Sequence, residues 1–414
     1  MSVGVRERVG RTAPARLLLL LGPAFVAAIA YVDPGNVAAN LTAGSRYGYL
    51  LVWVLVAANA IAVFVQYQSA KLGIVTGRTL PELLGQRLGT AGRRAYWVQA
   101  ELVAAATDIA EVIGGAIALN LLFGLPLPVG GVIVGLVAIG ILAVQSRRGQ
   151  RTFETVIVGL LAVIAVGFLT GLFVSPVDWG QAAAGLVPRF DGAPTVLLAA
   201  GMLGATVMPH AIYLHSALAR DRHGSTEDAG RIRTLLRATR LDVVLALVIA
   251  GAVNIAMLLV AASSLRGVDG TGTIEGAHAA ISSALGPGNG VVFAIGLLAS
   301  GLASASVGSY AGATIMAGLL KVRVPLLARR VVTLIPAVLI LALGVDPTWA
   351  LILSQVFLSL GIPFAMIPLL RLTGSRAVMG ESADGLWVRI LGGAVAGLVV
   401  VLNLTLVVLT VLGP

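Results

Sequence analysis

Apolar windows of about 20 residues recur along the whole chain, and each is long enough to cross the hydrocarbon core of a membrane. Hydrophobic residues make up 58% and charged residues 11% of the 414 positions, so a soluble enzyme is nearly excluded. Gly and Pro interrupt the windows, which lack the short alternating segments of a membrane β-barrel. We therefore predict an all-α integral membrane protein with about eleven transmembrane helices.

The connections between the predicted spans are short, so residues 1–414 are expected to form a single membrane transport domain. The longest polar connections, 219–239 and 266–289, are interpreted as solvated loops. The predicted spans are residues 17–41, 48–72, 95–123, 128–146, 151–174, 193–218, 240–265, 290–319, 325–344, 347–371 and 387–412.

The Lys and Arg residues are divided unequally between the two sides of the predicted membrane. If the N-terminus is cytoplasmic, the outward connections hold only Arg46, Arg189 and Arg266 of the 28 basic residues. This distribution follows the positive-inside rule, and an odd number of spans then places the C-terminus outside. The formal net charge of +10 thus reflects topology, and no nucleic-acid partner is expected. Cleavage of a signal peptide after Ala30 would remove half of the first span, so we expect this segment to remain as an anchor.

Two predicted spans contain helix-breaking polar sequence. The first span carries Asp33-Pro34-Gly35-Asn36, and the sixth carries Met208-Pro209-His210. These spans occupy corresponding positions if residues 17–174 and 193–371 form two repeats of five helices, the second inverted. Matched broken helices in the two halves of a transporter indicate a substrate site near the middle of the membrane.

Each proline in these breaks frees a backbone carbonyl four residues earlier, on Ala30 and on Ala205. Within a membrane such a carbonyl needs a partner from protein, water or an ion. Asp33 would add charge, Asn36 an amide oxygen and Met208 a thioether, which together favour a cation site. An unpaired Asp in the middle of a membrane costs roughly 3 kcal/mol, so a purely structural role for Asp33 is not expected. Taken alone, Asn36 could instead hydrogen-bond to the broken turn, and Met208 could be a packing residue of the core.

The mixed donor set indicates which cation the site prefers. Mg²⁺ and Ca²⁺ prefer oxygen donors alone, and the sulfur makes the site less suited to them. The chain has no Cys, and His210 and His215 lie five residues apart, which does not chelate a metal on one helix face. Zn²⁺ and Cu²⁺ are thereby disfavoured, and Mn²⁺ or Fe²⁺ fits best. His210 could also move a proton near the break, while His215 is predicted to be a hydrogen-bonded core residue.

The third span carries three acidic residues, Glu101, Asp108 and Glu111, at spacings that place them near one helix face. Arg329 and Arg330 in the ninth span are candidate partners. Such buried pairs mark either a proton relay or a clamp between helices, and the sequence leaves both interpretations open.

The two broken motifs resemble those of the Nramp family, which are proton-coupled divalent metal transporters. The similarity includes Gly22-Pro23-Ala24-Phe25 and Gly204-Ala205-Thr206-Val207, which precede the two motifs, and it covers nearly the whole chain. The resemblance implies a leucine-transporter-type fold with an inverted 5+5 repeat and an extra eleventh helix. It also implies metal ligands, which are Asp33, Asn36, Met208, the Ala205 carbonyl, the Ala30 carbonyl in some states, and Gln355 during occlusion. For protons, it implies Asp108 as acceptor, with Glu111, Arg329 and Arg330 continuing the route.

The expected function is therefore proton-coupled import of Mn²⁺, and also of Fe²⁺, by alternating access across a bacterial cytoplasmic membrane. No resident cofactor and no obligatory protein partner are expected. One alternative is a Na⁺-coupled transporter of amino acids or other small solutes with the same fold. A second is an intramembrane enzyme, although the sequence contains neither H-E-x-x-H nor G-x-S-x-G.

Overall fold

The computed structural model describes residues 20–322 and 324–412, and these residues form helices and connections without a strand. The short helices are α2 (Pro23–Ala28), η1 (Ile29–Val32), α3 (Pro34–Tyr47), α5 (Leu80–Arg87), α9 (Trp179–Ala184), α13 (Ile274–Leu285), α17 (Arg376–Met379) and η2 (Gly380–Ser382). The longer ones are α4 (Val52–Thr76), α6 (Thr90–Phe123), α7 (Leu127–Arg148), α8 (Gln150–Val174), α10 (Gly192–Thr206), α11 (Pro209–His223), α12 (Ala229–Ser264), α14 (Pro287–Leu320), α15 (Leu326–Ala342), α16 (Pro347–Thr373) and α18 (Leu386–Leu412).

All eleven predicted spans coincide with helical segments, which confirms the all-α membrane fold. Within the described ranges, nine segments are long and apolar enough to cross a membrane, with α10 and α11 taken as one segment. The other two are the broken pair α2–η1 and α3, and α15 with its 17 residues. The first span was predicted to begin at residue 17, and its residues 17–19 lie outside the described part of the chain.

Two polar connections were predicted wrongly as loops. Within 219–239, α11 continues to His223 and α12 begins at Ala229, so only a short turn separates them. Within 266–289, α13 forms because Ile274, Ala277 and Ile281 recur at helical spacing and are buried against the neighbouring helices. The Gly and Ser residues of this segment concealed the apolar face of a short helix.

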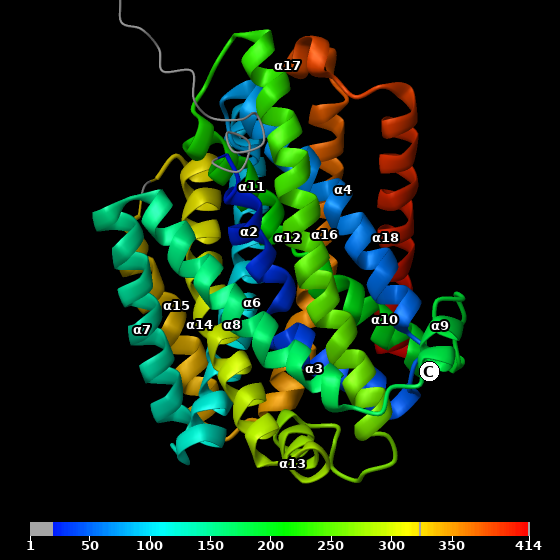
Figure 1. Ribbon diagram of the computed structural model, residues 1–414. Coiled ribbons are helices and arrows are strands. Elements are labelled where there is room, and N and C mark those ends of the chain that lie inside the picture. The colour runs from blue at the N-terminus through cyan, green and yellow to red at the C-terminus, as the bar shows by residue number, and fades with distance from the viewer. Residues whose placement is uncertain (1–19, 323, 413–414) are drawn as a thin grey trace, which may run out of the picture.

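The long helices run side by side between two ends of the molecule (Figure 1). The turn between α11 and α12 is flanked by arginines at the ends of both helices. It lies at the same end as α17, and α9 and α13 lie at the opposite end (Figure 1). In the interior, α6 packs against α14 and α16, and α12 packs against α3 and α4. This packing encloses both interrupted segments, so the two breaks lie in the core and away from the lipid-facing surface.

Candidate cation site and the adjoining ionic network

The first break lies between η1 and α3, where Asp33 adopts an extended conformation with φ −70° and ψ 166°. Pro34 takes the first position of α3, where a missing N–H costs nothing. The Asp33 carboxylate caps this helix, because its Oδ1 accepts a hydrogen bond of 2.8 Å from the Asn36 backbone N–H. Asp33 and Asn36 are both fully buried. A buried carboxylate therefore lies at the positive end of α3.

The second break separates α10 from α11 and is joined to the first by one amide group. Pro209 begins α11 and leaves the Ala205 carbonyl without its usual helical donor. This carbonyl instead accepts a hydrogen bond of 2.7 Å from Asn36 Nδ2. The same nitrogen donates to Asp33 Oδ1 at 2.7 Å. Three of the predicted ligand residues, Asp33, Asn36 and Ala205, thus converge on one point.

The remaining predicted ligand residues lie in or beside the breaks. Met208 is the residue immediately before α11, and Ala30 lies in η1; both are buried. Gln355, on α16, lies so close to the first break that a Cβ on Gly35 would be 1.7 Å from Gln355 Nε2. The same Cβ would be 3.2 Å from Asp33 Oδ2. The absence of a side chain at Gly35 is therefore what allows Gln355 to approach the break.

Two polar atoms at this junction are buried without a hydrogen-bond partner in the described part of the chain. They are Asp33 Oδ2 and Gln355 Oε1. Buried oxygens without donors are costly unless water or a cation occupies the space between them. No group of three or more His, Cys, Asp or Glu side chains that could hold a metal ion occurs among the described residues. The site therefore offers one carboxylate, with amide, carbonyl and thioether groups around it.

Sequence reasoning missed the residues that hold the first break open. Asn254 on α12 donates to the Tyr31 carbonyl at 2.7 Å, and Ser300 on α14 donates to the Val32 carbonyl at 2.6 Å. Asn254 also accepts a hydrogen bond of 2.9 Å from Asn40 of α3. A lone Asn or Ser inside an apolar span is the signal that could have identified them, because polar side chains in membrane helices commonly bond to neighbouring helices.

Two of the three acidic residues on α6 pair with the two arginines of α15. Arg330 Nη1 lies 3.2 Å from Asp108 Oδ1, and Arg329 Nη2 lies 2.6 Å from Glu101 Oε1. Arg329 Nη1 is also 3.8 Å from Asp108 Oδ2. Asp108 and Arg330 are almost completely buried, and Glu101 is partly exposed. The predicted pairing between α6 and α15 is thereby confirmed for Glu101 and Asp108.

Glu111 and His210 remain unpaired among the described residues. Both carboxylate oxygens of Glu111 and both ring nitrogens of His210 are buried without a hydrogen-bond partner. A Cβ on Gly308 of α14 would lie 3.0 Å from Glu111 Oε2 and 3.4 Å from Asp108 Oδ1, so both carboxylates face this glycine. Unsatisfied buried groups at this density are typical of a path that holds water.

A close helix contact connects the acidic face of α6 to the first break. A Cβ on Gly114 would lie 2.1 Å from Pro34 Cβ, so α6 rests directly on the proline that begins α3. Gly114 is three residues beyond Glu111 and therefore lies on the same side of the helix. The carboxylates and the broken helix are in this way parts of one packed unit.

His215, unlike His210, is bonded in the core as predicted. Its Nδ1 lies 2.8 Å from Gln66 Oε1, and Gln66 Nε2 donates to the Tyr31 hydroxyl. This chain ties α11 through α4 to η1, beside the first break. His215 therefore braces the two interrupted segments, whereas no described residue orients His210 by such a bond.

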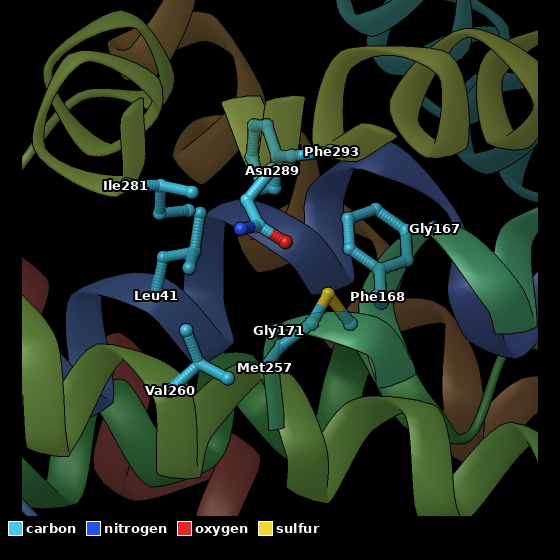
Figure 2. A pocket seen from close by; sticks show the side chains of 9 residues that line it. All are labelled: Leu41, Gly167, Phe168, Gly171, Met257, Val260, Ile281, Asn289 and Phe293. Carbon is cyan, nitrogen blue, oxygen red and sulfur yellow. The ribbon is translucent and has the colours of Figure 1, made fainter. Parts of the chain in front are cut away.

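A small cavity of about 20 Å³ lies apart from both the breaks and the ion pairs. Leu41, Phe168, Met257 and Phe293 give it apolar walls, and the Asn289 amide projects into it (Figure 2). Asn289 Nδ2 donates to the Leu285 carbonyl at 2.5 Å. A space of this size holds about one water molecule, and the Asn289 amide is the polar group that Figure 2 shows within its apolar lining.

Residues 24–409 match the family described as natural resistance-associated macrophage protein-like, or Nramp. A divalent metal cation transporter, MntH, of Mycobacterium tuberculosis (strain CDC 1551 / Oshkosh) is 59% identical over 411 residues, which cover 99% of this chain and 96% of that protein. The MntH of Bacillus subtilis (strain 168) is 46% identical over 95% of this chain and 92% of its own length.

The crystal structure of the Eremococcus coleocola manganese transporter in complex with an aromatic bis-isothiourea substituted compound has a TM-score of 0.87 to this chain. The two are 33% identical, and the match covers 97% of this chain and 88% of that one. The leucine-transporter-type fold is further supported by MhsT in complex with L-phenylalanine, with a TM-score of 0.61 at 15% identity over 92% of this chain and 98% of that one. At that identity the likeness shows the fold alone.

Proposed function

Because this chain belongs to the Nramp family, we propose that it imports Mn²⁺, and also Fe²⁺, together with protons by alternating access. The observation that carries the proposal is the convergence of the two broken segments on the Asn36 amide. The related proteins named as divalent metal cation or manganese transporters support the substrate class. Residues 1–414 act as one transport domain, with repeats at 17–174 and 193–371 and the extra helix at 387–412.

The metal enters as substrate and replaces the bridging N–H group. Asn36 Nδ2 now donates to two acceptors, Asp33 Oδ1 and the Ala205 carbonyl. A cation between these oxygens would repel that NH₂ group, and rotation of the amide by half a turn would present Asn36 Oδ1 instead. In the empty transporter the amide thus satisfies the same acceptors that the ion satisfies in the loaded one. This exchange lowers the cost of returning without cargo, because Asp33 Oδ1 and the Ala205 carbonyl have a partner in both states.

The other proposed ligands set the preference among ions and the closure of the site. Met208 supplies a soft thioether, which favours Mn²⁺ and Fe²⁺ over Mg²⁺ and Ca²⁺. Gln355, with its unpaired Oε1, approaches the metal from α16 when the site closes. The Ala30 carbonyl joins the ligands in the conformations that bring η1 closer.

Protons follow the acidic face of α6. Asp108 is the proposed proton acceptor, and Glu111, Arg329 and Arg330 continue the route toward the cytoplasm. Glu101 holds Arg329 in place, and His210, at the start of α11, is the proposed carrier of a proton beside the metal site. The divalent cation beside Asp33 favours release of a proton from Asp108 through charge repulsion.

The proposed location is a bacterial cytoplasmic membrane, with the N-terminus inside and the C-terminus outside. The distribution of basic residues supports this orientation. The turn between α11 and α12, which arginines of both helices flank, would then face the cytoplasm, together with α17 (Figure 1).

The deciding experiment is uptake of Mn²⁺ into proteoliposomes in the presence of excess Ca²⁺ and Mg²⁺, for wild type and for Met208→Ala. Wild type should take up Mn²⁺ despite the competitors, and Met208→Ala should become sensitive to them by about tenfold or more, since it loses the soft ligand. Met202→Ala is the control, because Met202 is also fully buried but lies in a different part of the core. Failure of the wild type to accumulate Mn²⁺ would overturn the proposal.

A further inference from the structure

A groove of about 470 Å³ lies between the facing ends of α16 and α18, far along both helices from the cation site. Its volume is in the range of small-molecule sites in proteins. Leu370 of α16 and Val388 and Ala396 of α18 contribute apolar walls. Gly392 and Gly393 of α18 line the groove without side chains. A Cβ on Gly393 would meet nothing within 4 Å, so there is open space beside it. The groove is thus an open, mostly apolar space between two membrane helices.

Two arginines at the mouth of this groove have no partner among the residues that the structure describes. Arg371 lies in the last turn of α16 and Arg389 in the first turns of α18, and both line the groove and are exposed. Neither side chain forms an ion pair or hydrogen bond with any residue that the structure describes. The aliphatic stem of Arg389 covers Gly374, since a Cβ there would be 3.4 Å from Arg389 Cδ. The guanidinium groups are therefore free to bind an anion.

The acidic residue among those that line the groove does not neutralise these arginines. Asp384 Oδ1 accepts a hydrogen bond of 2.6 Å from Lys71 Nζ, and its Oδ2 accepts one of 2.5 Å from Gln68 Nε2. Both bonds draw the carboxylate toward α4, where Lys71 is largely buried. The Asp384 charge is thus balanced by Lys71, which leaves two positive charges at the mouth.

The surroundings place this mouth at the surface of the bilayer. Leu386 and Trp387, in the first turn of α18, are 67% and 81% exposed. An exposed Trp at the end of a membrane helix is typical of the interface where lipid headgroups lie. The start of α18 lies at the same end of the molecule as α17 (Figure 1). This end faces the cytoplasm in the proposed orientation. Basic pockets between helices on that side of a membrane bind anionic headgroups.

We propose that the groove binds one anionic glycerophospholipid of the surrounding bilayer. Its phosphate lies between the Arg371 and Arg389 guanidinium groups, and an acyl chain lies along the glycines of α18. The two guanidinium groups and the apolar groove fit the charged headgroup and the acyl chain of such a lipid. A free anion would leave the apolar part of the groove unfilled. Farther along α18, Asn403 accepts a hydrogen bond of 2.5 Å from Ser359 and joins the two helices directly. The lipid fills the gap at the end where such a bond is absent among the described residues.

The test measures lipid binding to the purified full-length protein by native mass spectrometry. The probes are phosphatidylglycerol, phosphatidylcholine with the same acyl chains, and inorganic phosphate. Wild type should retain phosphatidylglycerol in preference to phosphatidylcholine. The double variant Arg371→Gln/Arg389→Gln should bind phosphatidylglycerol roughly thirtyfold more weakly, as expected for two lost charges near an anionic headgroup. Arg376→Gln, an exposed arginine of α17 outside the groove, is the matched control and should bind like wild type.

Gly393→Leu tests the trough while both arginines remain. The larger side chain fills open space and favours the helix, so the protein should fold, yet phosphatidylglycerol binding should fall. Three results would overturn the proposal. They are equal retention of both lipids, an equal loss with Arg376→Gln, and displacement of phosphatidylglycerol by inorganic phosphate at similar concentrations. None of these readouts depends on metal transport, so they are independent of the proposed function.

Discussion

Asp108→Asn should destabilise the protein, and addition of Arg330→Met should restore most of the loss. Asp108 Oδ1 lies 3.2 Å from Arg330 Nη1, which at an effective dielectric constant of about 20 corresponds to an attraction of about 5 kcal/mol. The desolvation of both groups offsets most of this value, so the intact pair contributes little net stability. Removal of Asp108 alone leaves Arg330 buried and unpaired, and such changes cost about 3–5 kcal/mol.

The double variant removes both charges and substitutes an apolar side chain of similar length. Its stability should lie within about 1 kcal/mol of wild type, because Arg329 keeps its partner Glu101 at 2.6 Å. Thermal unfolding of wild type, both single variants and the double variant in one detergent gives the complete cycle. Glu381→Gln, on the exposed η2, is the control for loss of a carboxylate, and its melting temperature should differ little from that of wild type.

The same double variant separates the two interpretations of this network. If Asp108 accepts the transported proton, the stable double variant should lose the stimulation of Mn²⁺ uptake by an inward pH gradient. If the pair is only a clamp between α6 and α15, the stimulation should persist. Retained proton stimulation would therefore refute the assignment of Asp108, and a double variant less stable than either single variant would refute the electrostatic reasoning.

Two further predictions concern the helices around the cation site. Asp242 accepts backbone hydrogen bonds from Gly22 at 3.0 Å and Ala24 at 2.9 Å, so Asp242→Ala should release the start of α2. Thiol labelling of Ala24→Cys, in a chain with no native Cys, should then become roughly tenfold faster, as for loss of a hydrogen bond to a charged group. An unchanged labelling rate would contradict this role. Gly35→Ala should displace Gln355, whose Nε2 would be 1.7 Å from the new Cβ, and reduce Mn²⁺ uptake by about tenfold or more. Adding Gln355→Ala should return the melting temperature to that of Gln355→Ala alone, and a further drop would show that the clash lies elsewhere.

The breaks could be predicted from the sequence because their causes are local. Proline removes a specific helical hydrogen bond, and at Pro34 and Pro209 the polar residues beside it complete the interruption. Prolines without such neighbours lie inside continuous helices, namely Pro336, Pro363 and Pro368. The free Ala205 carbonyl follows from the same rule, and the structure contains it. Apolar windows and their lengths similarly determine the positions of the spans, because the thickness of the bilayer limits the length of each crossing.

The supporting contacts could not be predicted, because their partners are distant in sequence. Asp242 is 218 residues from Ala24, and Ser300 is 268 residues from Val32. Nothing in the spacing of an isolated polar residue tells which carbonyl it will reach. The failure at α13 has another cause, since its apolar face is short and lies among Gly and Ser residues that are typical of loops.

The contact between Gly114 and Pro34 offers the proposed metal and proton transport a means of coupling that needs no shared ligand. A Cβ on Gly114 would be 2.1 Å from Pro34 Cβ, and one on Gly308 would be 3.0 Å from Glu111 Oε2. The helix α6 is thus packed tightly between the proline of the broken helix and α14. If metal binding moves Pro34, α6 should be displaced with it, because protein interiors are close-packed and respond to displacement by shifts between discrete arrangements. Glu111, one turn from Gly114, and Asp108, nearly two turns from it, would then move relative to the arginines of α15. We expect that displacement to change which protonation state of the two carboxylates is favoured.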